Sequence, residues 1–203
     1  MVSAMASKAC VIVASGPSAK GFVAPDNVTV IAVNGAIEWL NRADYAFTLD
    51  PSKVNMARLK NRRPGVKYVV ALPQDFPAVK DVIRYKRVAY RGREPADKSS
   101  VDWWFWRLSC VKTLCTKKDS IHTGNSSWGA LGLAFHIGFK NVALIGVDGT
   151  SDKKVDGGGS GNLSHLAMLF ESALPQINVV SCGMLSSIPQ MSFQDWLCMY
   201  SLS

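Results

Sequence analysis

The chain has 203 residues, of which 48% are hydrophobic and 19% are charged, and its formal net charge is +8. This composition excludes an intrinsically disordered chain, and the length predicts one domain, residues 1–203, with a core large enough to fold alone. The positive charge favours anionic partners such as nucleotides, phosphates, nucleic acid or acidic lipid, although a basic solvent-facing surface accounts for it equally well.

Cysteine usage and hydropathy set two further limits. The five cysteines include no CxxC pair, and no group of His and Cys residues has the spacing of a zinc site, so we predict free thiols in a reducing compartment. No stretch approaches the roughly 20 apolar residues of a membrane span, and residues 1–9 lack the apolar core of a signal peptide. We therefore expect a soluble cytoplasmic protein without a membrane span.

In the first half of the chain, short apolar runs alternate with helix signals. Runs rich in Val and Ile predict buried parallel strands at residues 9–14, 28–33, 45–49 and 67–72. Between them we expect a short helix at residues 36–41. A second helix should run from the Asp50-Pro51-Ser52 triplet to about residue 60, because Ser and Asp favour N-caps and Pro suits the first helical turn.

Residues 73–118 interrupt this alternation, and we interpret them as a basic, Trp-rich insertion. Their periodicity is poor and predicts only a weak strand at residues 87–90 and a short helix near residues 101–108. Five cations precede three tryptophans: Arg84, Lys86, Arg87, Arg91 and Arg93, then Trp103, Trp104 and Trp106. Indole rings can stack on a base or sugar, but they more often fill a core or an interface. Segment 84–106 therefore predicts an anionic or protein partner, with a homo-oligomer or a virion assembly among the options.

The alternation resumes in the second half of the chain. A Thr-Gly-Asn-Ser-Ser loop at residues 123–127 opens a predicted helix that ends at Gly138, and a buried strand follows at residues 142–147. The glycine-rich loop at residues 156–161 is either a lid or an ordinary surface loop. A helix at 163–174, a strand at 177–181 and a helix at 193–200 complete the pattern. This order predicts an α/β fold: a Rossmann-like, doubly wound, mostly parallel sheet with helices on both faces.

Polar and small residues follow the predicted strands, at the edge where doubly wound sheets bind ligands. A glycine in the first turn lets the backbone approach a ligand, and free N–H groups at a helix start attract anions. Asn and Asp at strand ends can contact a base, a ribose or a metal, yet both are also common turn formers. No GxGxxG or GK[ST] motif is present, so neither a dinucleotide site nor a Walker site is expected. The predicted nucleotide-binding residues are Ser15, Gly16, Pro17, Ser18, Asn34, Asp50, Thr123, Gly124, Asn125 and Ser126.

Two residues, Asp148 and His165, are candidate catalytic residues. Asp148 ends a central strand, where a carboxylate often faces the ligand crevice, although it would also suit a cap of the next turn. His165 follows the glycine-rich loop and starts a helix, and an unperturbed imidazole titrates near neutrality, as a general base requires. A structural role for His165 is equally open. His122 is a second candidate base, and His136 is predicted to be structural.

The order of these motifs resembles that of the bacterial sialyltransferase superfamily and its motility-associated, hydroxymethylpterin-pyrophosphokinase-like relatives. The resemblance covers residues 9–50 and 120–182. In its first half, a Gly-Pro-Ser turn (Gly16-Pro17-Ser18) follows the first strand, an Asn (Asn34) follows the second, and a polar residue before Pro (Asp50-Pro51) follows the third. In its second half, a Thr/Ser-Gly loop (Thr123-Gly124) is followed by a strand that ends in Gly-x-Asp (Gly146-Val147-Asp148).

The resemblance implies a CMP-sugar or a related nucleotide donor, held by the Gly-Pro-Ser turn, Asn34 and the loop at residues 123–127. It implies His165 as the base that deprotonates an acceptor hydroxyl, and it implies no metal. Sialyltransferases carry tyrosines after the Gly-x-Asp strand; here Lys153 or Lys154 would neutralise the leaving phosphate instead. The chain is short, so we interpret it as a minimal relative, with a phage-encoded origin left open.

Three functions follow from these observations. The leading one is a nucleotide- or nucleotide-sugar-binding, metal-independent glycosyltransferase-like enzyme. The second is a diphosphokinase-like transferase in which Asp50 and Asp148 hold Mg²⁺. The third is a non-catalytic phage virion or host-interaction protein, found in the virion or the host cytoplasm, that uses segment 84–106 as its interface. Metal dependence separates the first two functions, and stable assembly without turnover would indicate the third.

Overall fold

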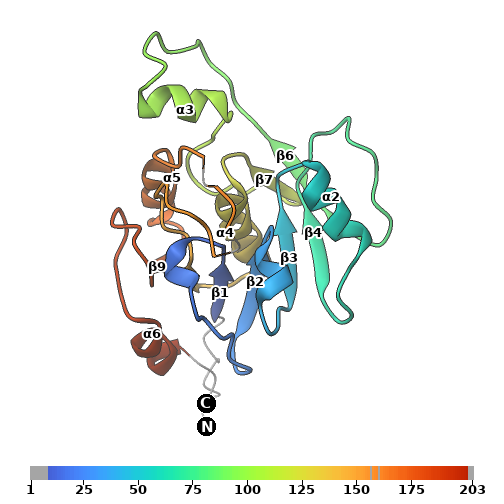
Figure 1. The fold of residues 1–203 in the computed structure, drawn as a ribbon. Helices are drawn as coiled ribbons and strands as arrows, with labels where there is room; N and C mark the ends of the chain where they lie inside the picture. Colours follow the sequence, from blue (N-terminus) through green and yellow to red (C-terminus); the bar gives the residue numbers. More distant parts are fainter. Residues whose placement is uncertain (1–8, 156, 160, 201–203) are drawn as a thin grey trace.

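The computed structural model describes residues 9–155, 157–159 and 161–200. Its centre is a seven-stranded sheet in which all neighbouring strands run parallel. In spatial order the strands are β5 (Ile83–Arg84), β4 (Lys67–Val70), β3 (Tyr45–Thr48), β2 (Thr29–Val33), β1 (Ala9–Val13), β8 (Asn141–Ile145) and β9 (Asn178–Ser181). The predicted parallel α/β fold class is confirmed (Figure 1).

The strand order reverses beside β1. From β1 the chain moves outward through β2, β3 and β4 to β5, and it later places β8 and β9 on the other side of β1. Val11 of β1 accordingly pairs with Val30 on one side and with Ala143 on the other. Doubly wound sheets bind ligands at the carboxyl end of such a switch point, because the loops that leave the two strands diverge there.

Alternate residues of the strands face two apolar layers, one on each side of the sheet. In β1, Cys10 and Ile12 pack in the layer of α4 (Ser126–Ile137) and α5 (Leu166–Ala173). Val11 and Val13 pack in the opposite layer, which contains three helices: α1 (Ala36–Trp39), α2 (Lys53–Lys60) and α6 (Phe193–Tyr200). Helices therefore cover both faces, and burial on both sides explains why the strand is continuously apolar in the sequence.

Helix α4 packs against the end of β3, close to the switch point. Asn125 caps its start by accepting a hydrogen bond from the Trp128 N–H at 3.0 Å, and Gly138 ends it with a φ of 95°. A Cβ at Gly129 would lie 2.6 Å from the Phe47 ring, so glycine at this position permits the close contact. The helix and its end at Gly138 agree with the pattern in the sequence.

Residues 73–118 contain β5, β6 (Lys86–Val88) and α3 (Val101–Arg107). Strand β6 pairs in parallel with β7 (Ser120–His122) and forms a separate two-stranded sheet. A strand was expected at residues 87–90, and β6 lies slightly closer to the N-terminus. Strands β5 and β7 were not expected, because such short runs show no periodicity. Helix α3 buries none of its residues and projects beyond the edge where the strands of the large sheet end (Figure 1).

All five cysteines are free thiols, and Cys10, Cys110 and Cys115 are buried. Burial raises the pKa of the Cys110 thiol to about 12, which keeps it protonated at neutral pH. Within the described ranges, no helix is both long and apolar enough to cross a membrane.

Candidate functional site

A pocket of about 680 Å³ opens at the carboxyl edge of the large sheet, among the loops that follow β1, β2, β3 and β8. This carboxyl-edge pocket has the volume of a small-molecule site. The predicted residues that line it are Ser15, Gly16, Pro17, Asn34, Asp50, Gly124, Asn125, Ser126 and Asp148. Ser18, Thr123 and His165 do not line it. The fold thus brings together loops from both halves of the chain, and it places three of the predicted residues elsewhere.

The carboxylate of Asp148 fastens the turn after β1 to the loop after β9. Asp148 Oδ2 accepts a hydrogen bond from the Ser18 N–H at 2.9 Å. Asp148 Oδ1 accepts from the Ser18 hydroxyl at 2.5 Å and from the Met184 N–H at 3.2 Å, and Ser18 Oγ accepts from the Gly146 N–H at 3.0 Å. Asp148 is only 6% exposed. Its carboxylate therefore has a structural role in this state, and its catalytic role stays a prediction.

Gly16 is required by the contact between its turn and the end of β8. A Cβ at Gly16 would lie 2.5 Å from Asp148 Oδ2 and 2.5 Å from the Gly146 carbonyl oxygen. The Gly16 N–H donates to that same carbonyl at 2.9 Å. We expected a ligand to be the reason for this glycine, and the structure supplies a different reason. Ser18 likewise uses its hydroxyl within the Asp148 cluster, so its role in ligand binding stays a prediction.

Asn34 ends β2 in the left-handed conformation, with a φ of 51°. Its N–H donates to the Phe47 carbonyl at 3.0 Å, which holds the turn against β3. Its side-chain Oδ1 is buried and has no hydrogen-bond partner among the described residues, although Asn34 lines the carboxyl-edge pocket. Leaving a buried amide oxygen unpaired costs free energy. A hydrogen-bond donor on a ligand would remove that cost.

The start of α4 forms a second part of the wall. Ser126 Oγ accepts a hydrogen bond from the Leu49 N–H at 3.1 Å, which ties the first residue of α4 to the end of β3. The N–H groups of a first helical turn have no acceptor within the helix, so this end attracts anions. Thr123 has another place: it is fully buried, and its hydroxyl donates to the Ser109 carbonyl.

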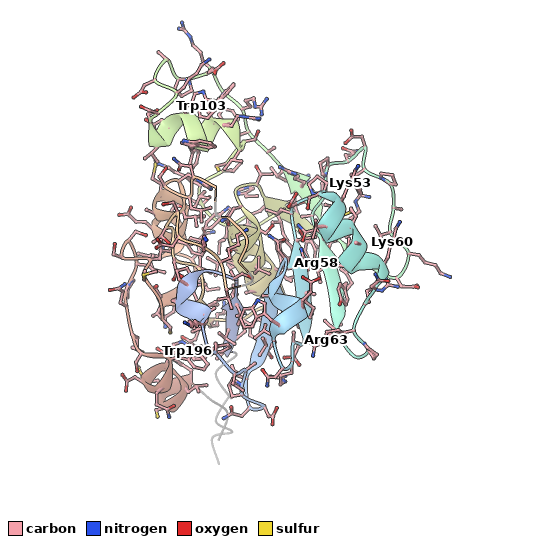
Figure 2. All side chains as sticks on the ribbon, in the orientation of Figure 1. Lys53, Arg58, Lys60, Arg63, Trp103 and Trp196 are labelled. Carbon is pink, nitrogen blue, oxygen red and sulfur yellow. The ribbon has the colours of Figure 1, made fainter. Side chains whose placement is uncertain are left out.

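Among the described residues, three cations and two carboxylates line the pocket: Arg58, Arg87, Lys154, Asp50 and Asp148. Arg58 lies on the side of α2 that faces the strands (Figure 2) and pairs with Glu38 of α1 at 2.6 Å. Asp50 is exposed and forms the turn before α2, because its carboxylate accepts from the Ser52 N–H at 2.9 Å and from Asn55 Nδ2 at 2.8 Å. Among the described lining residues the cations outnumber the carboxylates, which favours an anionic ligand.

Arg87 reaches the pocket from β6. It is half-buried, and its Nη1 donates to the Leu49 carbonyl at 3.5 Å, which is long for a hydrogen bond. Burial lowers the pKa of the guanidinium, and the Asp50 carboxylate raises it in part. The sequence predicted an anionic or protein partner for the segment that contains Arg87, and the structure places Arg87 in the lining of the carboxyl-edge pocket. The partner stays a prediction.

Arg84 and Arg91 contact other residues of the insertion at residues 73–118. Arg84 donates to the Phe76 carbonyl at 2.9 Å, and the Arg91 guanidinium lies 5.0 Å from the centre of the Trp106 ring. Trp103, on the projecting helix in Figure 2, donates its indole N–H to Glu94 at 2.9 Å. These contacts explain how the segment folds, and its protein partner stays a prediction.

His165 directly precedes α5 and is fully buried. Neither ring nitrogen has a hydrogen-bond partner in the described part of the chain, and burial lowers the pKa of the imidazole to about 4. Leu163 and Leu166 on either side line the pocket, but His165 does not. A general base needs contact with the group that it deprotonates. The buried position of His165, outside the pocket, does not favour a role as a base, and that role stays a prediction.

The start of the glycine-rich loop lies against the turn after β1. The Val155 N–H donates to the Ser15 carbonyl at 2.8 Å, and the Lys154 N–H donates to the Gly158 carbonyl at 2.9 Å. Asp156 and Ser160, which belong to the same loop, lie outside the described residues. The interpretation of this loop as a lid stays a prediction.

No group of three or more His, Cys, Asp or Glu side chains is placed to hold a metal ion in the described part of the chain. The two carboxylates assigned to Mg²⁺ in the diphosphokinase alternative both line the pocket. Each of them, Asp50 and Asp148, already accepts hydrogen bonds through both of its oxygens. A carboxylate has about four acceptor sites, so Asp50 keeps sites open, and the diphosphokinase alternative stays a prediction.

Sequence reasoning missed several lining residues. Asn55 and Arg58 lie three residues apart on α2, and both line the pocket. Their spacing was a usable signal, since residues three apart share one face of a helix and this helix begins just after Asp50. The place of Arg87 had no such signal, because it depends on the pairing of the two short strands β6 and β7.

No family model matches the sequence, and neither does any curated protein. The solved structure of the MAf glycosyltransferase from Magnetospirillum magneticum AMB-1 is similar to this chain, with a TM-score of 0.52 and 16% sequence identity. The match covers 93% of this chain and 34% of that one, so this chain spans about a third of that protein's length. The two proteins share an α/β fold.

Proposed function

We propose that this protein binds a nucleotide or a nucleotide-sugar in the carboxyl-edge pocket and acts as a metal-independent glycosyltransferase. The observation that carries the proposal is Asn34: it lines a pocket at the strand-order switch, and its buried side-chain oxygen has no partner among the described residues. The fold shared with the MAf glycosyltransferase supports the class of enzyme. The motif order that resembles the sialyltransferases makes a CMP-sugar the first donor to test.

In this proposal the pocket residues have separate tasks. Asn34 accepts a hydrogen bond from the base or ribose, and the start of α4 binds a phosphate through its free N–H groups. In the transfer step, an acceptor oxygen bonds to the sugar's anomeric carbon as the bond from that carbon to the donor phosphate breaks. The pocket cations stabilise the negative charge that develops on the leaving phosphate. The acceptor proton passes to a base, for which the motif order implies His165.

A thermal-shift screen tests the binding half of the proposal. The ligands are CMP, UDP, GDP and ATP, together with CMP- and UDP-sugars, each with and without Mg²⁺. At a concentration of about 100 times Kd, a ligand should raise stability by about 2.7 kcal/mol, and this corresponds to a rise in Tm of roughly 5–10 °C for a chain of this size. We expect one nucleotide to give this shift without Mg²⁺, and slow donor hydrolysis to accompany it. A Mg²⁺-dependent shift would support the diphosphokinase alternative, and binding without turnover would support a non-catalytic protein.

Asn34→Gly is the variant that tests the site. Glycine keeps the left-handed turn at φ 51° and removes the unpaired oxygen. Asp119→Gly is the matched control, because Asp119 has a similar φ of 55° and does not line the pocket. The Asn34 variant should lose most of the nucleotide shift, and the Asp119 variant should keep it. An equal shift in both variants would place the nucleotide elsewhere.

A further inference from the structure

Arg87 is held in place by backbone hydrogen bonds that join its strand to both ends of β7. The Lys86 N–H donates to the Asp119 carbonyl at 2.7 Å, and the Thr123 N–H donates to the Val88 carbonyl at 2.8 Å. Arg87 itself pairs with Ile121 of β7, which is buried against α4. The Cα of Arg87 is therefore fixed relative to α4, whose start forms a wall of the carboxyl-edge pocket.

The guanidinium of Arg87 has few partners of its own. It offers five N–H donors, yet its one hydrogen bond within the described part of the chain is the 3.5 Å contact with the Leu49 carbonyl. The ion pairs of the described residues do not include Arg87. Asp50 is close enough to influence its charge, but the Asp50 oxygens accept from Ser52 and Asn55 instead.

The other two pocket cations differ from Arg87. Arg58 is neutralised by Glu38 at 2.6 Å and also donates to Asn55 Oδ1 at 2.7 Å. Lys154 is exposed on the loop after β8, where a flexible ammonium is well hydrated. Arg87 is half-buried, so its donors are partly removed from water without receiving an anion in exchange. Such a guanidinium matches the planar geometry of a carboxylate or phosphate.

We propose that Arg87 forms an oxyanion subsite of the carboxyl-edge pocket, which binds either the phosphate of the nucleotide or a carboxylate on the sugar that it carries. The inference rests on the proposed function, because it names the ligand group that the same pocket receives. Arg87 belongs to the insertion at residues 73–118. The insertion therefore contributes directly to ligand recognition, and Leu108, at its far end, also lines the pocket.

Calorimetric titration at low ionic strength tests this subsite with Arg87→Gln, Arg87→Lys and a matched control, Lys86→Gln. Lys86 is adjacent on β6, exposed and outside the pocket. The probes are CMP against cytidine, UDP-glucuronate against UDP-glucose, and pyrophosphate. Arg87→Gln should weaken binding of the oxyanion-bearing probe about 10- to 100-fold. Arg87→Lys should recover part of the loss, because it keeps the charge and loses the planar fork.

The probes distinguish the two sources of the oxyanion. Loss of affinity for CMP and pyrophosphate, with cytidine unchanged, assigns the subsite to phosphate. A loss confined to UDP-glucuronate assigns it to a sugar carboxylate. Equal affinities for Arg87→Gln and Lys86→Gln overturn the subsite and leave the proposed function standing. Arg87-dependent pyrophosphate binding without nucleotide binding leaves the subsite standing and overturns the proposed function. Failure of the wild-type protein to bind any probe overturns both.

Discussion

Single residues reach the carboxyl-edge pocket in two ways: some follow a strand or open a helix, and others are held by contacts between residues far apart in the chain. Asn34, Asp50 and Asn125 could be placed at the ligand edge because each follows a recognisable strand or opens a helix. The hydrogen bonds between Asp148 and Ser18 join residues 130 positions apart. No local pattern encodes such a contact, and the same carboxylate therefore looked like a candidate for catalysis.

His165 provides a prediction at this scale. Its pKa in the folded protein is about 4, below the ordinary 6.5 of histidine, because burial disfavours the charged imidazolium. Between pH 6.5 and 4 the unfolded chain binds more protons at this residue, so stability falls as the pH is lowered through that window. At pH 5 the contribution of His165 to the free energy of unfolding should be about 2 kcal/mol less favourable than at pH 8. Urea denaturation at the two pH values measures the difference.

The comparison variant is His165→Gln, which removes the titrating group. This variant should lose most of the difference in unfolding free energy between pH 8 and pH 5, whatever its stability at pH 8. His122→Gln provides the control, and it should retain the difference. A wild-type pH dependence that survives in His165→Gln would mean that the imidazole is not held neutral by burial.

At the scale of elements, length and periodicity decide what the sequence predicts. The core strands and α4 were predictable because buried runs of four or more residues and a capped helix leave clear patterns. Strands β5 and β7 have two and three residues, and their pairing depends on the rest of the fold. The sequence consequently predicted an anionic or protein partner for the segment of Arg87, but not the place of this residue in the pocket.

The start of α4 provides a prediction at the scale of elements. Asn125→Ala removes the cap on the Trp128 N–H and should cost about 1 kcal/mol of stability. The same change should weaken nucleotide binding, because the first turn of α4 lines the pocket and would fray. Denaturation and calorimetric titration of one preparation give both quantities.

Ser192→Ala is the matched control for this prediction. Ser192 Oγ accepts from the Asp195 N–H at 3.1 Å near the start of α6, away from the pocket residues. Its loss should cost a similar amount of stability and leave nucleotide affinity unchanged. If both variants reduce affinity equally, the effect comes from global stability and not from the start of α4.

At the scale of the whole molecule, the order of strands positions the site. The alternation of strands and helices predicts a doubly wound sheet, and the ligand edge follows from that topology. Which loops meet at the edge depends on the switch between β1 and β8. The resemblance named most of those loops in advance, and the contribution of the insertion through Arg87 and Leu108 emerged only from the three-dimensional arrangement.

The most direct test of the central claim is a two-dimensional ¹H–¹⁵N NMR titration of the full chain with CMP and then with UDP, GDP and ATP, in the presence of EDTA. We expect one nucleotide to shift the amide signals of residues 15, 16, 34, 35, 50, 52, 54, 55 and 124–127, which line the pocket from four separate segments. The amides of α6 should not move. Shifts confined to another surface, or no shifts with any nucleotide, would contradict nucleotide binding in the carboxyl-edge pocket.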